Sequence, residues 1–162
     1  MATGTPATTA LTTAGIAFTE RRYSHDPSSS SYGLEAANAL GVEPARVFKT
    51  LVAQIEDASS TPTLVVGIVP VDRSLDLKAL ARALKAKRAA MASVMDAERS
   101  SGYVAGGISP IGQRRPLATV LDASAFEHAT VLVSGGQRGL DIELAPADLV
   151  TMTQASVAAI AT

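Results

Sequence analysis

Two glycine-rich segments contain the residues of this sequence best suited to chemistry. The first runs from Gly106 to Arg115 (Gly-Gly-Ile-Ser-Pro-Ile-Gly-Gln-Arg-Arg) and the second from Ser134 to Leu144 (Ser-Gly-Gly-Gln-Arg-Gly-Leu-Asp-Ile-Glu-Leu). Each places a Gly-Gly pair beside a hydroxyl and a cation. Glycine reaches positive φ and lets main-chain N–H groups approach a ligand closely, so each segment is suited to cradling an anion or an oxyanion. The alternative is a pair of ordinary turns.

Three further polar residues lie in or at the ends of predicted strands, among apolar neighbours. Lys49 opens a predicted strand and can aim its ammonium into a cavity, although a solvated edge lysine is the alternative. Asp141 lies inside an apolar strand, where a carboxylate is costly unless it is paired or faces solvent. Tyr23 ends the first predicted strand, where its hydroxyl is available to a ligand unless the ring only packs.

Several common kinds of active site are excluded by the sequence. There is no Cys, and the two histidines, His25 and His128, form no H-x-x-x-H pair, so we expect no metal site. No G-x-S-x-G, P-loop or G-x-G-x-x-G motif is present. The remaining possibility is a pocket of backbone donors, hydroxyls and a few charges, with no cofactor.

The overall composition is typical of a globular protein that does not attract polyanions as a whole. The chain has 162 residues, 47% hydrophobic and 18% charged, so we expect one domain over residues 1–162. The net charge of −1 excludes a global attraction to nucleic acid, and we expect no DNA partner. The absence of Cys, of a secretory leader in Met1–Thr9 and of a long apolar run indicates a cytoplasmic location without a membrane span.

The basic residues nevertheless cluster locally. A solvated helix face is one interpretation, and a phosphate-contacting rim around a pocket is the other. The clusters are Lys78, Arg82, Lys85, Lys87 and Arg88 in and after one predicted helix, and Arg114, Arg115 and Arg138 beside the glycine segments.

The elements that position these residues alternate between short strands and short helices. Expected helices begin after Thr5, at Tyr32, after Asp76, after Ser93 and at Ala147, the last running to the end of the chain. Expected strands are Ile16–Tyr23, Lys49–Glu56, Leu64–Val69, Tyr103–Ala105, Leu117–Leu121, Thr130–Ser134 and Leu140–Leu144, the second and third joined by a hairpin tip at Asp57–Pro62. This order predicts an α+β fold with a mixed, largely antiparallel sheet, curled or barrel-like, surrounded by helices.

Five motifs in this order resemble the YbaK/EbsC family, whose members are free-standing relatives of the editing domain inserted in bacterial prolyl-tRNA synthetase. The similarity covers nearly the whole chain. The motifs are Tyr23–Pro27, Phe48–Leu51, Leu75–Lys78, Gly106–Gln113 and Ser134–Leu144.

The resemblance implies a trans-editing deacylase. Such enzymes remove cysteine mischarged onto tRNA(Pro) and also act on Cys-tRNA(Cys). The cysteine thiol is thought to attack its own ester and to leave as a cyclic thiolactone, which agrees with the missing protein nucleophile. The implied partner is aminoacyl-tRNA, with prolyl-tRNA synthetase as a second partner to test.

The resemblance also implies roles for individual residues. Lys49 would hold the aminoacyl end of the tRNA, near the terminal phosphate or the ester. Gly106 and Gly107 would contribute main-chain groups around the ester and the terminal ribose, while Tyr23 and Asp141 would position the amine or the ribose hydroxyls. The remaining residues implied to bind substrate are Thr50, Tyr32 (where relatives often carry Phe), Ser109, Ser134, Gly135 and Arg138.

Two other functions stay open at this point. One is a deacylase for a different small amino acid, such as alanine on tRNA(Pro). The other is a non-catalytic module that binds tRNA and shows salt-sensitive affinity without deacylation.

Overall fold

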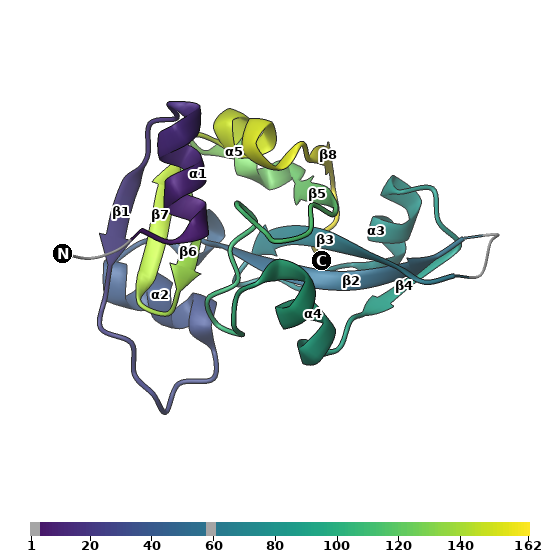
Figure 1. Cartoon of the computed structure of the whole chain (residues 1–162), viewed down its shortest axis with the longest axis horizontal. Coiled ribbons are helices and arrows are strands. Elements are labelled where there is room, and N and C mark those ends of the chain that lie inside the picture. Colours follow the sequence, from purple (N-terminus) through teal and green to yellow (C-terminus); the bar gives the residue numbers. More distant parts are fainter. Residues whose placement is uncertain (1–3, 58–60) are drawn as a thin grey trace.

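In the computed structural model, which describes residues 4–57 and 61–162, eight strands form two sheets with helices packed around them (Figure 1). The smaller sheet is antiparallel in the order β1-β7-β6, with β1 at Thr19–Arg22, β6 at Val131–Gln137 and β7 at Leu140–Leu144. The larger sheet has the order β4-β2-β3-β5-β8. Its strands are β2 (Phe48–Glu56), β3 (Thr63–Pro70), β4 (Arg88–Met91), β5 (Ala118–Asp122) and β8 (Ser156–Ala158).

The two sheets pack against each other but do not close into a barrel. One parallel bridge between Val47 and Leu132 links them just before β2 begins. The β3–β5 and β5–β8 pairs are parallel, and the other strand pairs are antiparallel. The prediction of a mixed, largely antiparallel α+β fold is therefore confirmed.

Short helices, each begun and ended by local signals, surround the sheets. The first helix starts at a capping box formed by Thr5 and Thr8, and Gly15 ends it in the left-handed conformation. The Asp76 and Ser93 side chains cap the third and fourth helices by accepting the N–H groups of Ala79 and Asp96. The helices are α1 (Pro6–Ala14), α2 (Tyr32–Leu40), α3 (Leu77–Ala83), α4 (Val94–Ser101) and α5 (Pro146–Thr153), with short 3-10 turns at Pro44–Arg46 and Ala123–Glu127.

The β2–β3 hairpin separates two hydrophobic cores. Phe48 and Val52 face the core shared with the smaller sheet, α1 and α4. Ala53 and Val65 face a second core, in which Leu80 of α3 is buried. Successive side chains of a strand point to opposite faces, so α3 and α4 cover opposite faces of this hairpin.

Three sequence-based expectations about these elements were wrong or incomplete. Tyr103–Ala105 is not a strand, because this stretch turns immediately after α4. The helix expected from Ala147 to the chain end stops at Thr153, where Gln154 takes φ +55°, and β8 follows. Strand β4 was not anticipated, and residues 58–60 of the expected hairpin tip lie outside the described residues. No helix in the described ranges has the length and apolar character needed to cross a bilayer.

Candidate active site

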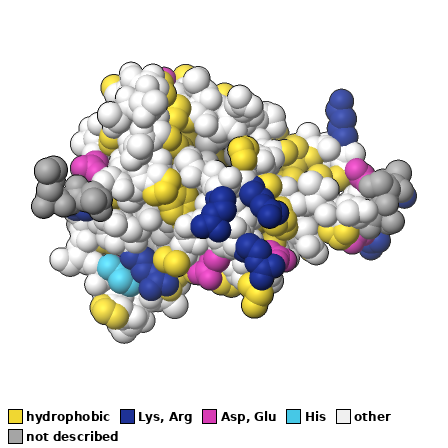
Figure 2. Space-filling model, viewed as in Figure 1, with side chains coloured by type: hydrophobic (Ala, Val, Ile, Leu, Met, Phe, Trp, Pro, Cys, Tyr) yellow, Lys and Arg dark blue, Asp and Glu magenta, His cyan; other side chains and the backbone are white. Residues whose placement is uncertain are grey.

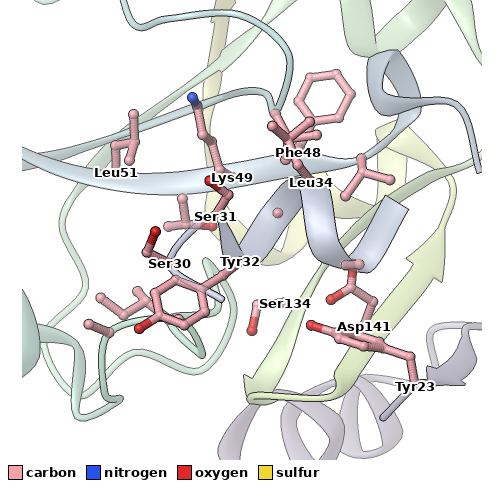
Figure 3. Close-up of a pocket in the computed structure, with 18 residues that line it drawn as sticks. Tyr23, Ser30, Ser31, Tyr32, Leu34, Phe48, Lys49, Leu51, Ser134 and Asp141 are labelled. Atoms are coloured by element: carbon pink, nitrogen blue, oxygen red, sulfur yellow. The ribbon is translucent and has the colours of Figure 1, made fainter. Parts of the chain in front are cut away.

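A pocket of about 450 Å³ opens where the start of β2, helix α2 and the smaller sheet meet (Figure 3). Its volume lies within the range of about 300–1,000 Å³ that is usual for small-molecule sites. Seven residues singled out in the sequence come together here from six separate stretches of chain. They are Tyr23, Tyr32, Lys49, Thr50, Gly106, Ser134 and Asp141.

Asp141 is the most unusual group in the pocket. It lies at the centre of the smaller sheet, with Arg21 of β1 and Ser134 of β6 as its cross-strand partners. The residue is only 5% exposed, and no side chain or N–H group in the described ranges donates a hydrogen bond to its carboxyl group. Burial raises the pKa of Asp141 to about 7, although the Arg21 guanidinium opposes this shift. The carboxyl group can therefore change its charge near neutral pH.

Tyr23 and Lys49 lie at opposite sides of the pocket. The Tyr23 ring lies beside Asp141 in Figure 3, and burial followed by the charge of Asp141 raises the pKa of the phenol. The Lys49 ammonium lies across β2 from these groups. Burial lowers the pKa of Lys49, and the carboxylate that opposes this shift is Asp72. Lys49 and Asp141 are thus separate charges that can contact different parts of one ligand.

Thr50 carries an unused hydroxyl in the pocket wall. Its Oγ1 is buried and has no hydrogen-bond partner among residues 4–57 and 61–162. A buried unpaired hydroxyl costs about 1–3 kcal/mol, so such a group usually has a reason to remain. The Ser134 hydroxyl, by contrast, already accepts a hydrogen bond from the Gly136 N–H at 3.2 Å. Thr50 is therefore the hydroxyl of the pocket wall that lacks a partner among the described residues.

Gly106 forms a tight part of the wall because no larger residue fits. It adopts φ +87°, and a Cβ there would lie 2.8 Å from the Tyr32 ring and from Nε of Arg138. Arg138 donates from Nε and Nη2 to the Ala105 carbonyl, and its guanidinium lies 5.0 Å from the centre of the Tyr32 ring. Ala105 is also held from its other side, because its N–H donates a hydrogen bond to Glu98 of α4 at 2.8 Å.

Four residues expected in the site do not line the pocket but support its walls. The Gly107 N–H donates to the Val104 carbonyl, and Ser109 is fully buried with its Oγ bonded to the Ile111 N–H. Gly135 packs against Leu140 within a bulge of β6. Arg138 belongs to the two-residue turn between β6 and β7 and acts on the pocket through Ala105 and Tyr32.

The histidines are not arranged to activate a nucleophile in this pocket. His25 Nδ1 lies 2.8 Å from Glu35 Oε1, and Glu35 Oε2 accepts the Asp26 N–H, so this pair closes the loop before α2. Neither His25 nor His128 lines the pocket. No cluster of potential metal ligands was found in the ranges that the structure describes.

Several pocket residues were not anticipated. Most are apolar residues on α2 or near the ends of β2 and β3, and their sequence carries no chemical signal. Only Ser30 and Ser31, directly before the predicted helix at Tyr32, were detectable as hydroxyls near a helix start. The unanticipated residues are Ser30, Ser31, Gly33, Leu34, Ala36, Val47, Phe48, Leu51, Val71, Ala105 and Ile108.

Comparison with known proteins identifies a family and relatives of similar sequence. Residues 27–152 match the family described as the aminoacyl-tRNA editing domain. Over 126 residues the chain is 39% identical to EbsC of Enterococcus faecalis, which is described as a Cys-tRNA(Pro)/Cys-tRNA(Cys) deacylase. The match covers 78% of this chain and 74% of that protein.

Solved structures have the same fold over almost the whole chain. One, described as a trans-editing enzyme for prolyl-tRNA synthetase, has a TM-score of 0.78 at 25% identity and covers 97% of this chain and 95% of its own. The hypothetical protein APE2540 has a TM-score of 0.82 at 21% identity, covers 97% and 99%, and supports the fold alone. From the sequence match and the fold together, this chain belongs to the aminoacyl-tRNA editing domain family.

Proposed function

We propose that this protein is a trans-editing deacylase that removes cysteine mischarged onto tRNA(Pro), and that it also acts on Cys-tRNA(Cys). The observation that carries the proposal is a pocket with positioning groups but no activated nucleophile of its own among the described residues. Such a pocket suits a substrate that brings its own nucleophile. The similarity to EbsC supports cysteine as that substrate.

The proposed reaction takes place within the bound aminoacyl ester. The cysteine sulfur attacks the ester carbonyl carbon, and the bond from that carbon to the ribose oxygen breaks. The thiol gives up its proton as the sulfur attacks, the ribose oxygen takes up one proton as it leaves, and cysteine is released as a cyclic thiolactone. The protein contributes orientation and stabilisation of the developing negative charge.

The pocket residues divide these tasks. Asp141 and Tyr23 would hold the substrate amine or the ribose hydroxyls, and Lys49 would hold the aminoacyl end near its phosphate or ester. The Gly106 N–H donates to no described backbone carbonyl, so it is available to the ester oxygen. The Thr50 hydroxyl has no partner among the described residues, and we propose that a small shift of the wall lets it bond the ligand.

The proposal extends to location and partner. We place the protein in the cytoplasm, where charged tRNA is made, and expect it to work beside prolyl-tRNA synthetase. Similarity to a structure described as a trans-editing enzyme for that synthetase supports the pairing. A net charge of −1 also suggests that a partner shares in holding the tRNA.

The test is a deacylation panel with Cys-tRNA(Pro), Ala-tRNA(Pro) and Ser-tRNA. Cysteine alone of the three has a thiol, so we expect turnover of Cys-tRNA(Pro) and a thiolactone product, which, unlike free cysteine, does not react with a thiol-specific reagent until its ring opens. The variant Lys49→Ala should lose turnover by about 100-fold with an unchanged unfolding midpoint, because the ammonium lies at the pocket and not in the core.

Each alternative outcome has a clear meaning. Cleavage of Ala-tRNA(Pro) without cleavage of Cys-tRNA(Pro) would replace cysteine by alanine as the substrate. Binding of tRNA without release of any amino acid would make the protein a binding module. Deacylation by Lys49→Ala at the wild-type rate would remove Lys49 from the mechanism.

A further inference from the structure

Four exposed arginines surround the segment that leads from α4 to the pocket. Arg99 lies in the last turn of α4, and the N–H groups of Arg114 and Arg115 donate to the carbonyls of Ser101 and Ser100 at the end of that helix. Arg138 binds the Ala105 carbonyl in the pocket wall. We call Arg99, Arg114, Arg115 and Arg138 the arginine surface.

The arginine surface is fixed to the pocket by main-chain contacts. The Arg114 side chain lies over Gly102, where a Cβ would be 3.3 Å from the arginine Cβ. Four residues after α4, Ala105 is held by Glu98 on one side and by Arg138 on the other. The cations and the pocket wall therefore form one continuous structure and not two separate loops. Lys and Arg side chains gather at the centre of the face in Figure 2, over α4 and the chain that follows it.

The arginine surface differs in its pairing from four of the other six arginines, while Arg73 and Arg82 likewise form no ion pair in the described ranges. Arg21, Arg22, Arg46 and Arg88 each form an ion pair with a glutamate. None of the arginine surface is paired with a carboxylate among residues 4–57 and 61–162. The nearby carboxylates of Glu98 and Asp96 form no ion pair with these arginines within the described ranges, and Glu98 instead accepts the Ala105 N–H. Unpaired guanidinium groups are suited to bidentate contacts with phosphate.

We infer that the arginine surface binds the phosphate backbone of an RNA whose 3′ end enters the pocket. This inference rests on the proposed function for the choice of RNA. It selects one of the two basic clusters seen in the sequence, because α3 covers the opposite face of the β2–β3 hairpin from α4. In Figure 1, α3 also lies toward the far end of that hairpin from α2, which lines the pocket.

The experiment measures binding of an uncharged acceptor-stem minihelix of tRNA(Pro) by fluorescence anisotropy at several salt concentrations. We expect the triple variant Arg99→Gln/Arg114→Gln/Arg115→Gln to bind at least about tenfold more weakly. The slope of the logarithm of its binding constant against the logarithm of salt concentration should be smaller in magnitude by about 2–3. The matched control is Lys78→Gln/Arg82→Gln/Lys85→Gln on α3, which removes the same charge and should bind within about twofold of wild type. A third variant, Arg99→Lys/Arg114→Lys/Arg115→Lys, keeps the charge and should keep the salt slope.

The outcomes separate this inference from the proposed function. Wild-type affinity and salt slope in the glutamine variant, or an equal loss in the α3 control, would overturn the inference while deacylation by the wild-type protein still stood. RNA binding that depends on these arginines, in a protein that releases no amino acid, would support the surface and remove the deacylase. If the glutamine variant instead lost only its association with prolyl-tRNA synthetase, the surface would be a protein interface and the inference would be wrong.

Discussion

Two carboxylates on β7, two residues apart and on the same face of the strand, have opposite environments. Glu143 accepts hydrogen bonds from Thr130, Arg21 and Arg46, and these contacts, that from Thr130 foremost, hold its pKa below the usual value. Asp141 lies deeper, accepts no hydrogen bond from the described residues, and has its pKa raised to about 7 by burial. One strand thus carries a satisfied carboxylate at its outer end and an unsatisfied one at the pocket.

The difference separates a carboxylate that holds the fold together from one for which we propose a role in binding. Glu143 ties β1, β7 and the 3-10 turn that holds Arg46. It also engages Arg21, the residue directly across from Asp141, so that this guanidinium is bonded to Glu143 and not to Asp141. A buried charge without a partner is costly, and because Asp141 lies in a pocket wall we propose that a ligand supplies the partner.

The largest effect on turnover is expected from Asp141→Asn. The amide keeps the shape but loses the ionisable group, so we expect deacylation to fall by about 100-fold or more. We expect Cys-tRNA(Pro) deacylation by wild type, measured from pH 5 to 9, to show an inflection near pH 7, and we expect Asp141→Asn to lose it.

The stability of the same variant gives an independent check. Because the folded pKa is raised from 3.8 to about 7, the folded state binds more protons than the unfolded state between these values. Wild-type stability should therefore fall as pH rises through this window, and that fall should be absent from Asp141→Asn. Parallel curves of unfolding free energy against pH for the two proteins would show that Asp141 ionises normally.

The contribution of Glu143 to stability should depend on pH with the opposite sign to that of Asp141, and Glu143→Gln tests this. Removing this carboxylate leaves Arg21 and Arg46 without their partner and should cost about 1–3 kcal/mol at pH 7. The pKa of Glu143 is depressed, so its contribution is present above the ordinary value of 4.5 and is lost as pH falls through the folded pKa below it. Urea denaturation at pH 7 and pH 3 measures both.

The matched control for this variant is Glu20→Gln on β1. Glu20 pairs with Arg22 at 3.3 Å in an exposed position, so its loss should change stability by less than about 1 kcal/mol. Equal destabilisation by the two substitutions would mean that the Glu143 network is an ordinary surface ion pair.

Thr50→Val should have the smallest effect. Valine keeps the β-branched shape and removes a buried hydroxyl without a partner among the described residues, so folding stability should stay equal or rise slightly. Turnover should fall about tenfold if the hydroxyl bonds the substrate. The control Thr119→Val removes a buried hydroxyl that already donates to the Leu117 carbonyl, and it should lower stability without changing turnover. Turnover of Thr50→Val at the wild-type rate would make this hydroxyl a packing residue.

The fold was predictable where local signals and hydrophobic patterns agree. Capping residues such as Thr5 and Asp76 locate helix starts, and the apolar run of β3 identifies its hairpin. The strands that were missed are those whose formation depends on pairing with strands far away in the sequence. Strand β4 has little β-propensity and forms because it adds to the edge of β2, and β8 forms because it pairs in parallel with β5. The sequence near these strands does not contain that information.

The candidate site was predictable in its polar members and not in its walls. Lys49, Asp141 and Tyr23 were identified because a charge or hydroxyl in an apolar strand is unusual. Whether a glycine faces a cavity depends on tertiary packing, and the two glycines of one pair differ: Gly106 lines the pocket, while Gly107 packs against the main chain of Gln137. The residues of α2 that complete the pocket are ordinary apolar residues, so only the structure identifies them.

The hydrogen bonds that hold Ala105 from both sides have a consequence for the entropy of binding. The wall from Gly102 to Gly107 has no regular secondary structure, yet Glu98 and Arg138 fix it in the free protein. Ordering a backbone costs about 1–2 kcal/mol per residue, and here that cost is met during folding, before any ligand arrives. A ligand that binds against this segment therefore loses less binding free energy to ordering the backbone from Gly102 to Gly107.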